Sequence, residues 1–307
     1  MEIDELLERA PLLSAHHDRV VIGCSGGPDS IGLLALAAHA QRDAVAVYVD
    51  HGLRSDSASD FDVVRSAADR FGMPAVMVSL ELDPGSSNLE ARARDARLQV
   101  LEEQRAVAAA ASIWLAHSVD DQAETVLLAM MRGSGLAGMA GMAAHRGRIE
   151  RPVLALRRWE LAATCVAQGL QVVDDPMNHD LRFNRVWVRR HLMPMLNEHA
   201  QRDMPIVLAR QAQIVRADHE YLERAAAAVL AEAGSALSVE LMRSIDGVIA
   251  RRVVRQFLGE PPIGGKHIEA ALSVVYGTAK AVELPNRRTL RRSGGILFVE
   301  PTQRVTE

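Results

Sequence analysis

A six-residue segment rich in glycine and serine has the composition of an anion-binding loop. It reads Ser25-Gly26-Gly27-Pro28-Asp29-Ser30 and directly follows the apolar run Val20–Cys24. Glycine lets the backbone approach an anion closely, and serine adds hydroxyl donors. The end of a first parallel strand, at the start of a helix, is where phosphate groups commonly bind. We therefore expect all six residues to surround a phosphate group, although Gly-Gly-Pro-Asp is also ordinary turn chemistry.

Two acidic residues three positions apart form a second candidate site. Asp121 and Glu124 lie in a segment that is expected to be helical, just after the short apolar run Ser112–Ala116. A spacing of three places both carboxylates on one face of a helix, where they can hold amino groups. The alternative is a capping box that starts at Ser118, which would explain Asp120 and Asp121 as helix-stabilising acids but would not explain Glu124.

Alternating strand and helix patterns must position these two sites. Four apolar runs indicate strands, at 20–24, 44–49, 74–80 and 112–116. The segments between and after them favour helices, at 31–41, 57–71, 89–111 and 120–132. Apolar strands that are separated by helices predict a parallel sheet covered on both faces, which is a doubly wound α/β domain. The loop and the acidic pair would then lie together at the carboxyl edge of this sheet.

The second half of the chain has a different character. Residues 185–196, 201–233, 246–258 and 266–276 favour helices, and residues 281–300 favour strands. Residues 1–175 carry 16 Lys+Arg against 25 Asp+Glu, whereas residues 176–307 carry 19 against 14. We place a domain boundary near residue 190, with a catalytic domain over 1–190 and a mainly helical accessory domain over 191–307. An acidic first part beside a basic second part indicates different partners for each, although two ordinary solvated surfaces would also account for the difference.

The loop resembles the PP-loop of the ATP pyrophosphatases, and the further segments together resemble the tRNA(Ile)-lysidine synthase family. Their order and spacing carry the resemblance, which covers about residues 15–197. These segments are Val49–Arg54, Asn88–Arg97, His117–Thr125, Arg132–Gly135, and Asp174–Asn178 followed by Arg182, Phe183 and Arg185. The chain departs from the family pattern at Leu98, Ser118 and Val186-Trp187.

The resemblance implies a ligase that uses ATP to adenylate C2 of the wobble cytidine in a CAU-anticodon tRNA(Ile). Free lysine then displaces AMP to form lysidine. By the same resemblance the PP-loop and Asp50 bind ATP, Asp121 and Glu124 bind lysine, and Arg97 and Arg189 lie near the reaction centre. Which of these two arginines faces lysine and which faces AMP stays open. Magnesium is expected beside the phosphates, with no ligand assigned.

Arg182, Arg185 and Arg189 keep the family's spacing near the expected domain junction. Because an RNA backbone is attracted to such positive charge, we expect Arg182 and Arg185 to contact tRNA. The alternative is a solvated basic helix face.

Two other functions are weaker. A related tRNA thiolase would need cysteines for a persulfide or a cluster, and this chain has only Cys24 and Cys165, far apart in sequence. A non-catalytic RNA-binding protein would not need an intact PP-loop. We also expect a cytoplasmic protein, because the amino terminus lacks a secretory pattern and no uncharged apolar run is long enough to span a membrane. The oligomeric state stays open, a homodimer included.

Overall fold

The computed structural model describes residues 2–15, 18–50, 52, 57–80, 89–175, 179–234, 236–259 and 263–301. Seven residues of the segments discussed above lie outside this part of the chain: His51, Leu53, Arg54, Asn88, Pro176, Met177 and Asn178. The chain packs as two units, Met1–Ile214 and Val215–Glu307. Within the described residues, no helix has both the length and the apolar character needed to cross a membrane.

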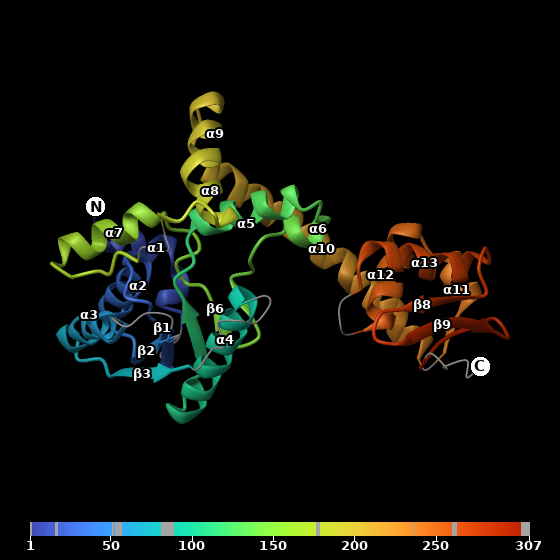
Figure 1. The fold of residues 1–307 in the computed structure, drawn as a ribbon, viewed down its shortest axis with the longest axis horizontal. Helices are drawn as coiled ribbons and strands as arrows, with labels where there is room; N and C mark the ends of the chain where they lie inside the picture. Colours follow the sequence, from blue (N-terminus) through green and yellow to red (C-terminus); the bar gives the residue numbers. More distant parts are fainter. Residues whose placement is uncertain are drawn as a thin grey trace. The chain divides into compact units, whose positions relative to one another are not determined.

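The first unit is built on a six-stranded sheet in the order β3-β2-β1-β4-β6-β5 (Figure 1). All neighbouring strands run parallel except β5 and β6, which form a short antiparallel pair. The strands are β1 (Val20–Gly23), β2 (Ala44–Asp50), β3 (Ala75–Ser79), β4 (Ser112–Leu115), β5 (His145–Arg146) and β6 (Ile149–Glu150). The four strands expected from the apolar runs are all present, whereas the apolar pattern did not indicate the two-residue strands β5 and β6.

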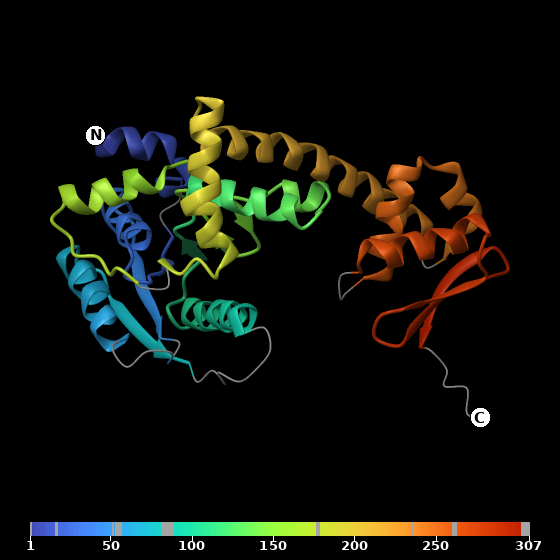
Figure 2. The same cartoon turned by 45° about the horizontal axis from the view of Figure 1, so that its top comes forward.

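Helices cover both faces of this sheet (Figures 1 and 2). Alternate strand residues face opposite layers, as a period of two requires. Val20 and Ile22 of β1 join the core that includes residues of α1, α2, α3 and α7. Val21 between them packs with Val100 and Leu101 of α4 on the other face. The helices are α1 (Ile3–Arg9), α2 (Pro28–His39), α3 (Ser57–Arg70), α4 (Leu89–Val107) and α7 (Arg158–Ala167). The doubly wound α/β prediction is confirmed.

The first unit continues through a helical segment that packs on α5 (Val119–Met131). Ala123 and Leu127 of α5 share a small core with Val188 and Met193. The elements here are α6 (Leu136–Met139), α8 (Asn184–Trp187), a π-helical turn (Val188–Leu192) and α9 (Met193–Ala200). Because of this packing, the boundary expected near residue 190 falls inside the first unit, and the units divide within α10 (Met204–Ala233). That residues 191–307 act as one accessory domain stays a prediction.

The second unit combines helices with a four-stranded sheet in the order β7-β10-β9-β8. Its core includes Val253 and Val254 of α12 together with Val274 and Val275 of α13. The elements are β7 (Leu237–Ser238), α11 (Val239–Ser244), α12 (Gly247–Leu258), α13 (Gly265–Tyr276), β8 (Ala281–Leu284), β9 (Arg288–Ser293) and β10 (Ile296–Pro301). The expected strand character of residues 281–300 is therefore present as three antiparallel strands.

Candidate active site

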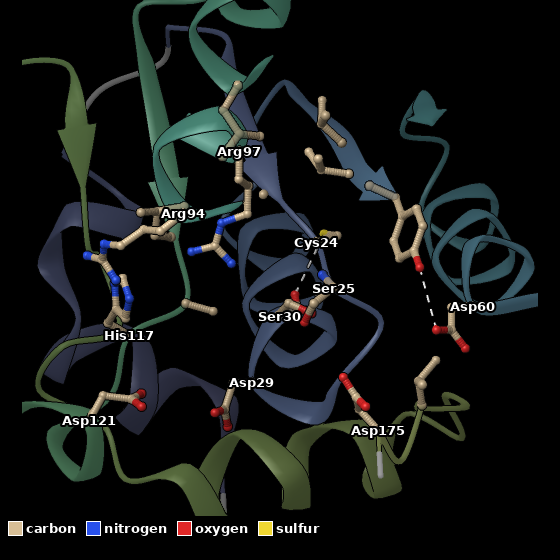
Figure 3. Close-up of a pocket in the computed structure, with 18 of the residues that line it drawn as sticks. Cys24, Ser25, Asp29, Ser30, Asp60, Arg94, Arg97, His117, Asp121 and Asp175 are labelled. Atoms are coloured by element: carbon tan, nitrogen blue, oxygen red, sulfur yellow. Dashed lines mark hydrogen bonds between the residues drawn. The ribbon is translucent and has the colours of Figure 1, made fainter. Parts of the chain in front are cut away.

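A cavity of about 430 Å³ opens where β1, β2 and β4 end. This is the carboxyl edge of the parallel strands, where open α/β sheets bind ligands. The volume lies in the range of small-molecule sites. Figure 3 shows acidic and basic side chains from several elements around the cavity. The candidate residues that line it are Ser25, Asp29, Ser30, Asp50, Arg97, Asp121, Arg185 and Arg189.

The glycine-rich loop forms one wall of the cavity. Gly26 has a φ of +81°, and a Cβ at this position would lie 2.7 Å from Cγ2 of Val173. The amide of Ser25 donates to Oγ of Ser30 at 3.2 Å, and this hydroxyl donates to the carbonyl of Gly27 at 3.0 Å. Pro28 opens α2, and Gly27 precedes it as a cap residue without a side chain. These two bonds hold the loop together at the amino terminus of α2, where backbone N–H groups can bind an anion.

The acidic pair lies on α5, and the capping-box and site interpretations both apply to Asp121. Its Oδ2 accepts hydrogen bonds from the amide of Ser118 at 2.9 Å and from the hydroxyl of Ser118 at 2.8 Å. Its other oxygen, Oδ1, accepts from two arginines. Asp120 lies outside the box and binds Arg157 and the amide of Arg158. Asp120 is thus an acid of the first turn of α5, as the capping explanation expects, and its carboxylate also binds α7.

Three arginines surround the buried carboxylates of Asp121 and Glu124. Arg158 donates to Asp121 at 2.8 Å and to Glu124 at 3.0 Å. Arg185 donates to the same two carboxylates at 3.2 and 2.8 Å. Arg189 donates to both oxygens of Glu124, at 2.7 and 3.2 Å. Burial alone would raise the pKa of Asp121, but the charges of Arg158 and Arg185 hold it well below its usual range. Asp121 is thus held as a carboxylate.

Arg158 is a site residue that the sequence reasoning missed. It opens α7, a helix that the sequence reasoning did not identify, and follows another arginine in an arginine-rich chain. Its Nε also donates to Asp29 of the loop at 3.2 Å. Arg158 therefore joins the phosphate loop to the acidic pair across three helices. The one available signal was Glu160, which accepts from the amide of Arg157 and marks a helix start in the sequence.

Arg97 enters the cavity from α4, and no ion pair joins it to an acidic side chain within the described part of the chain. Its Nε atom is buried and has no hydrogen-bond partner among the described residues. Burial lowers the pKa of Arg97, and the positive charges of Arg94 and Arg185 lower it further. A guanidinium that lacks an acid in the folded protein is suited to an anionic ligand. In Figure 3 it reaches into the space between His117 and the loop.

Asp29 and Asp50 line the cavity together with two further acidic residues, Asp60 and Asp175, which sequence reasoning did not single out as site residues. Burial raises the pKa of Asp29 to about 6, against the lowering effect of Arg158. Its Oδ1 is buried without a hydrogen-bond partner among the described residues. Asp50, at the end of β2, accepts a hydrogen bond from the amide of Gly52 at 2.9 Å. Among the described residues, no cluster of three or more His, Cys, Asp or Glu side chains is arranged to hold a metal ion.

The structure separates the two arginines that were expected to contact tRNA. Arg185 lies in the cavity, bound to Asp121 and Glu124. The side chain of Arg182 is 88% exposed and pairs with Asp180. A shared role at the RNA backbone is therefore not apparent from their positions, because only Arg182 points to solvent.

His117 is fixed as a neutral ring at the cavity wall. Nε of Arg151 donates to Nδ1 of His117 at 3.2 Å, so the neutral ring carries its proton on Nε2. Burial lowers the pKa of His117 to about 3; Asp121 opposes this shift, whereas Arg151, Arg185 and Arg97 reinforce it. His117 can therefore donate a hydrogen bond into the cavity but does not act as a base there.

Both cysteines are buried and unpaired. Burial raises the pKa of Cys24 to about 12 and that of Cys165 to about 11. Reactive cysteines need the thiolate form, so neither thiol is activated for sulfur transfer.

The chain is similar to known proteins in sequence and in fold. A family model described as a PP-loop domain matches residues 1–196. The tRNA(Ile)-lysidine synthase of Mycolicibacterium paratuberculosis is 39% identical to this chain, over 98% of each. That of Streptomyces coelicolor is 35% identical, over 97% of this chain and 89% of its own length. Among solved structures, the U34-tRNA thiolase NcsA from Methanococcus maripaludis aligns with a TM-score of 0.60 at 14% identity, covering 70% of this chain and 79% of its own. At that identity the likeness concerns the fold alone.

Proposed function

We propose an assignment of roles within the cavity from the premise that the chain belongs to the tRNA(Ile)-lysidine synthase family of PP-loop enzymes. The protein is an ATP-dependent ligase that acts on tRNA(Ile). It adenylates C2 of the wobble cytidine with release of pyrophosphate, and an amine then displaces AMP. One observation supports the assignment most directly: the phosphate loop and Asp121 line a single cavity, and Glu124 shares the arginine partners Arg158 and Arg185 with Asp121.

The loop residues Ser25–Ser30 and Asp50 bind ATP in this proposal. Backbone amides and hydroxyls at the start of α2 neutralise the departing pyrophosphate, which is electrostatic stabilisation where charge develops. The guanidinium of Arg97, whose Nε has no partner among the described residues, faces the α-phosphate, because AMP is the anion that remains between the two steps. Oδ1 of Asp29 likewise has no partner in the described ranges, and Mg²⁺ is commonly bound by one or two carboxylates together with substrate phosphates. Asp29 thus fits a magnesium ion, which would neutralise phosphate charge when bound.

Asp121 and Glu124 bind free lysine in this proposal. Lysine brings two ammonium groups, and both acids are buried and adjacent on one helix face. The ε-amine must lose a proton before it attacks C2, so one carboxylate is also suited to accept that proton. The C–N bond then forms as the bond from C2 to the AMP oxygen breaks.

Arg182 and Arg185 stay the proposed tRNA contacts, now with different tasks. Arg182 is exposed and suits a backbone phosphate. Arg185 lies within the cavity and suits the reacting nucleotide itself.

A thiolase function has little support in this chain. Thiolation needs activated cysteines, and both cysteines here are buried thiols with raised pKa values. A non-catalytic RNA-binding role is distinguished by an ATP–pyrophosphate exchange assay, which would give no signal in that case.

The proposed function is tested by incubating the protein with ATP, lysine and a CAU-anticodon tRNA(Ile) transcript, followed by nucleoside mass analysis. We expect the mass of lysidine at the wobble position, and none when lysine is omitted or when the transcript carries another anticodon. Unmodified cytidine under the complete conditions would refute the function.

A further inference from the structure

The carboxylates of Asp121 and Glu124 have no free capacity for an incoming amine. A carboxylate accepts about four hydrogen bonds. The two oxygens of Glu124 accept bonds from Arg158, Arg185 and twice from Arg189. Those of Asp121 accept two from Ser118 and one each from Arg158 and Arg185. An ammonium group can bind this pair only if an arginine leaves.

The positive charge around Asp121 and Glu124 also opposes the binding of an amine. Four guanidinium groups, those of Arg97, Arg158, Arg185 and Arg189, lie around the three carboxylates of Asp29, Asp121 and Glu124. A cation that enters this cluster is repelled until one guanidinium turns away or an anion arrives.

Arg189 is the arginine with the fewest bonds to lose. Arg158 is anchored by three carboxylates, including that of Asp29, and Arg185 binds both acids of the pair. The hydrogen bonds of Arg189 among the described residues all go to Glu124, since Asp121 is 3.9 Å away. Its side chain is 28% exposed and lines the same cavity as the phosphate loop.

We propose that Arg189 occupies the amine-binding oxygens of Glu124 in the free protein and is displaced when lysine binds. The proposal rests on the proposed function. It assigns Arg189 to the phosphate of ATP or AMP and not to lysine. A bound phosphate offers Arg189 a new partner of the same charge as Glu124, so the anionic substrate opens the lysine site. By reciprocity, lysine and the anion strengthen each other's binding by the same factor.

Calorimetric titration of lysine into the full-length protein tests this coupling. The titration is made with the protein alone and with α,β-methylene-ATP and Mg²⁺ at saturation. We expect lysine to bind about tenfold tighter with the analogue, which is ~1.4 kcal/mol. The Arg189→Gln variant should bind lysine tightly without the analogue and should gain little from it. Arg190→Gln, one residue further along and outside the acid cluster, serves as the matched control and should behave as the parent.

The alternative role of Arg189 gives a different pattern. If this arginine held the lysine carboxylate, Arg189→Gln would weaken lysine binding but leave binding of cadaverine, which lacks the carboxylate, unchanged. That result would overturn the inference. So would equal lysine affinity with and without the analogue in a protein that forms lysidine. A protein that forms no lysidine would instead refute the proposed function.

Discussion

At the residue scale, the structure shows contacts of individual side chains that the residue type alone does not determine. Asp121 serves both as the third residue of a capping box and as a site carboxylate, one oxygen for each task. The two interpretations were alternatives in the sequence, because a helix start and a ligand site favour the same acid. His117 likewise has a structural partner in Arg151 and still lines the cavity.

Gly26 should be the loop position that is most sensitive to substitution. Gly26→Val places a side chain 2.7 Å or less from Val173, at a φ of +81° that side chains rarely adopt. We expect ATP–pyrophosphate exchange to be lost and the fold to be retained, with a destabilisation of about 1–2 kcal/mol from the backbone strain. Gly133→Ala is the matched control, since Gly133 has a φ of +68° but open space around it. Full activity of Gly26→Val would refute the loop assignment.

His117 should make the protein less stable in mild acid. An unfolded histidine takes up a proton near pH 6.5, whereas burial lowers the folded pKa to about 3. Between these pH values the unfolded state binds more protons, so the free energy of unfolding decreases as the pH falls, and above pH 6.5 this effect is absent. Urea unfolding at pH 7 and pH 5 should show a loss of ~2 kcal/mol from this group.

His117→Gln should remove that component of the pH dependence. The free energy of unfolding of the parent and of the variant is measured at pH 7 and pH 5. Because the carboxylates change the stability of the two proteins alike, the difference between the proteins reports on His117. An identical pH dependence in the two proteins would show that His117 titrates normally. Nitrogen NMR of the ring gives an independent reading: we expect the proton on Nε2 at pH 6 and no titration there.

At the element scale, the short helix α7 brings the parts of the site together. The amino terminus of α7 carries Arg158 to the acids of α5 and to Asp29 at the start of α2. Gly32 of α2 allows this approach, since a Cβ there would lie 2.8 Å from the carbonyl of Leu161. Close packing of α2 on α7 thereby sets the distance between the phosphate loop and the acidic pair.

Removal of the Arg158 guanidinium should destabilise the first unit. Arg158→Met leaves Asp121, Glu124 and Asp29 with one cation fewer in a site that is largely buried. We expect a loss of about 2–4 kcal/mol in the free energy of unfolding, measured with denaturant. Arg182→Met provides the control, because that exposed pair with Asp180 should contribute nothing measurable. Equal stability of both variants would contradict the bridging role of Arg158.

The sequence predicted the main strands and most helices well, because their apolar patterns are long and regular. It did not reveal α7, whose ten residues begin with Arg158 and Trp159 directly after Arg157, a start that resembles a surface segment. It also could not show that Arg185 turns inward while Arg182 turns outward, since spacing in sequence does not fix side-chain direction at a helix start. The site carboxylates were predictable, but their arginine partners come from distant parts of the chain.

At the scale of the whole molecule, the question is how tRNA reaches the cavity. The net positive charge of residues 176–307 favours RNA, and Arg182 is an exposed arginine three residues before the site residue Arg185. Arg287, Arg288, Arg291 and Arg292 of the second unit are further candidates, although Arg291 pairs with Glu300 and Arg288 donates to the carbonyl of Leu258. A homodimer stays a prediction.

Charge reversal at Arg182 should weaken tRNA binding without changing the lysine site. Arg182→Glu is expected to raise the tRNA Michaelis constant and to reduce the salt slope of binding by about one. Arg185→Glu should additionally impair the use of lysine, because Arg185 binds Asp121 and Glu124. Arg19→Glu, at the opposite end of β1, is the control for net charge. An unchanged salt slope in Arg182→Glu would direct attention to the arginines of the second unit.

Adenylation and the attack of lysine take place at one site but depend on different residues. Substitutions in the acidic pair should therefore affect the second step and not the first. In Glu124→Gln and Asp121→Asn, single-turnover assays should follow adenylated tRNA and lysidine in the same reaction. We predict that adenylated tRNA still forms and accumulates, while its conversion by lysine falls by two orders of magnitude or more, at about 1.4 kcal/mol per tenfold. Normal use of lysine by either variant, or loss of adenylation alone in both, would contradict the account.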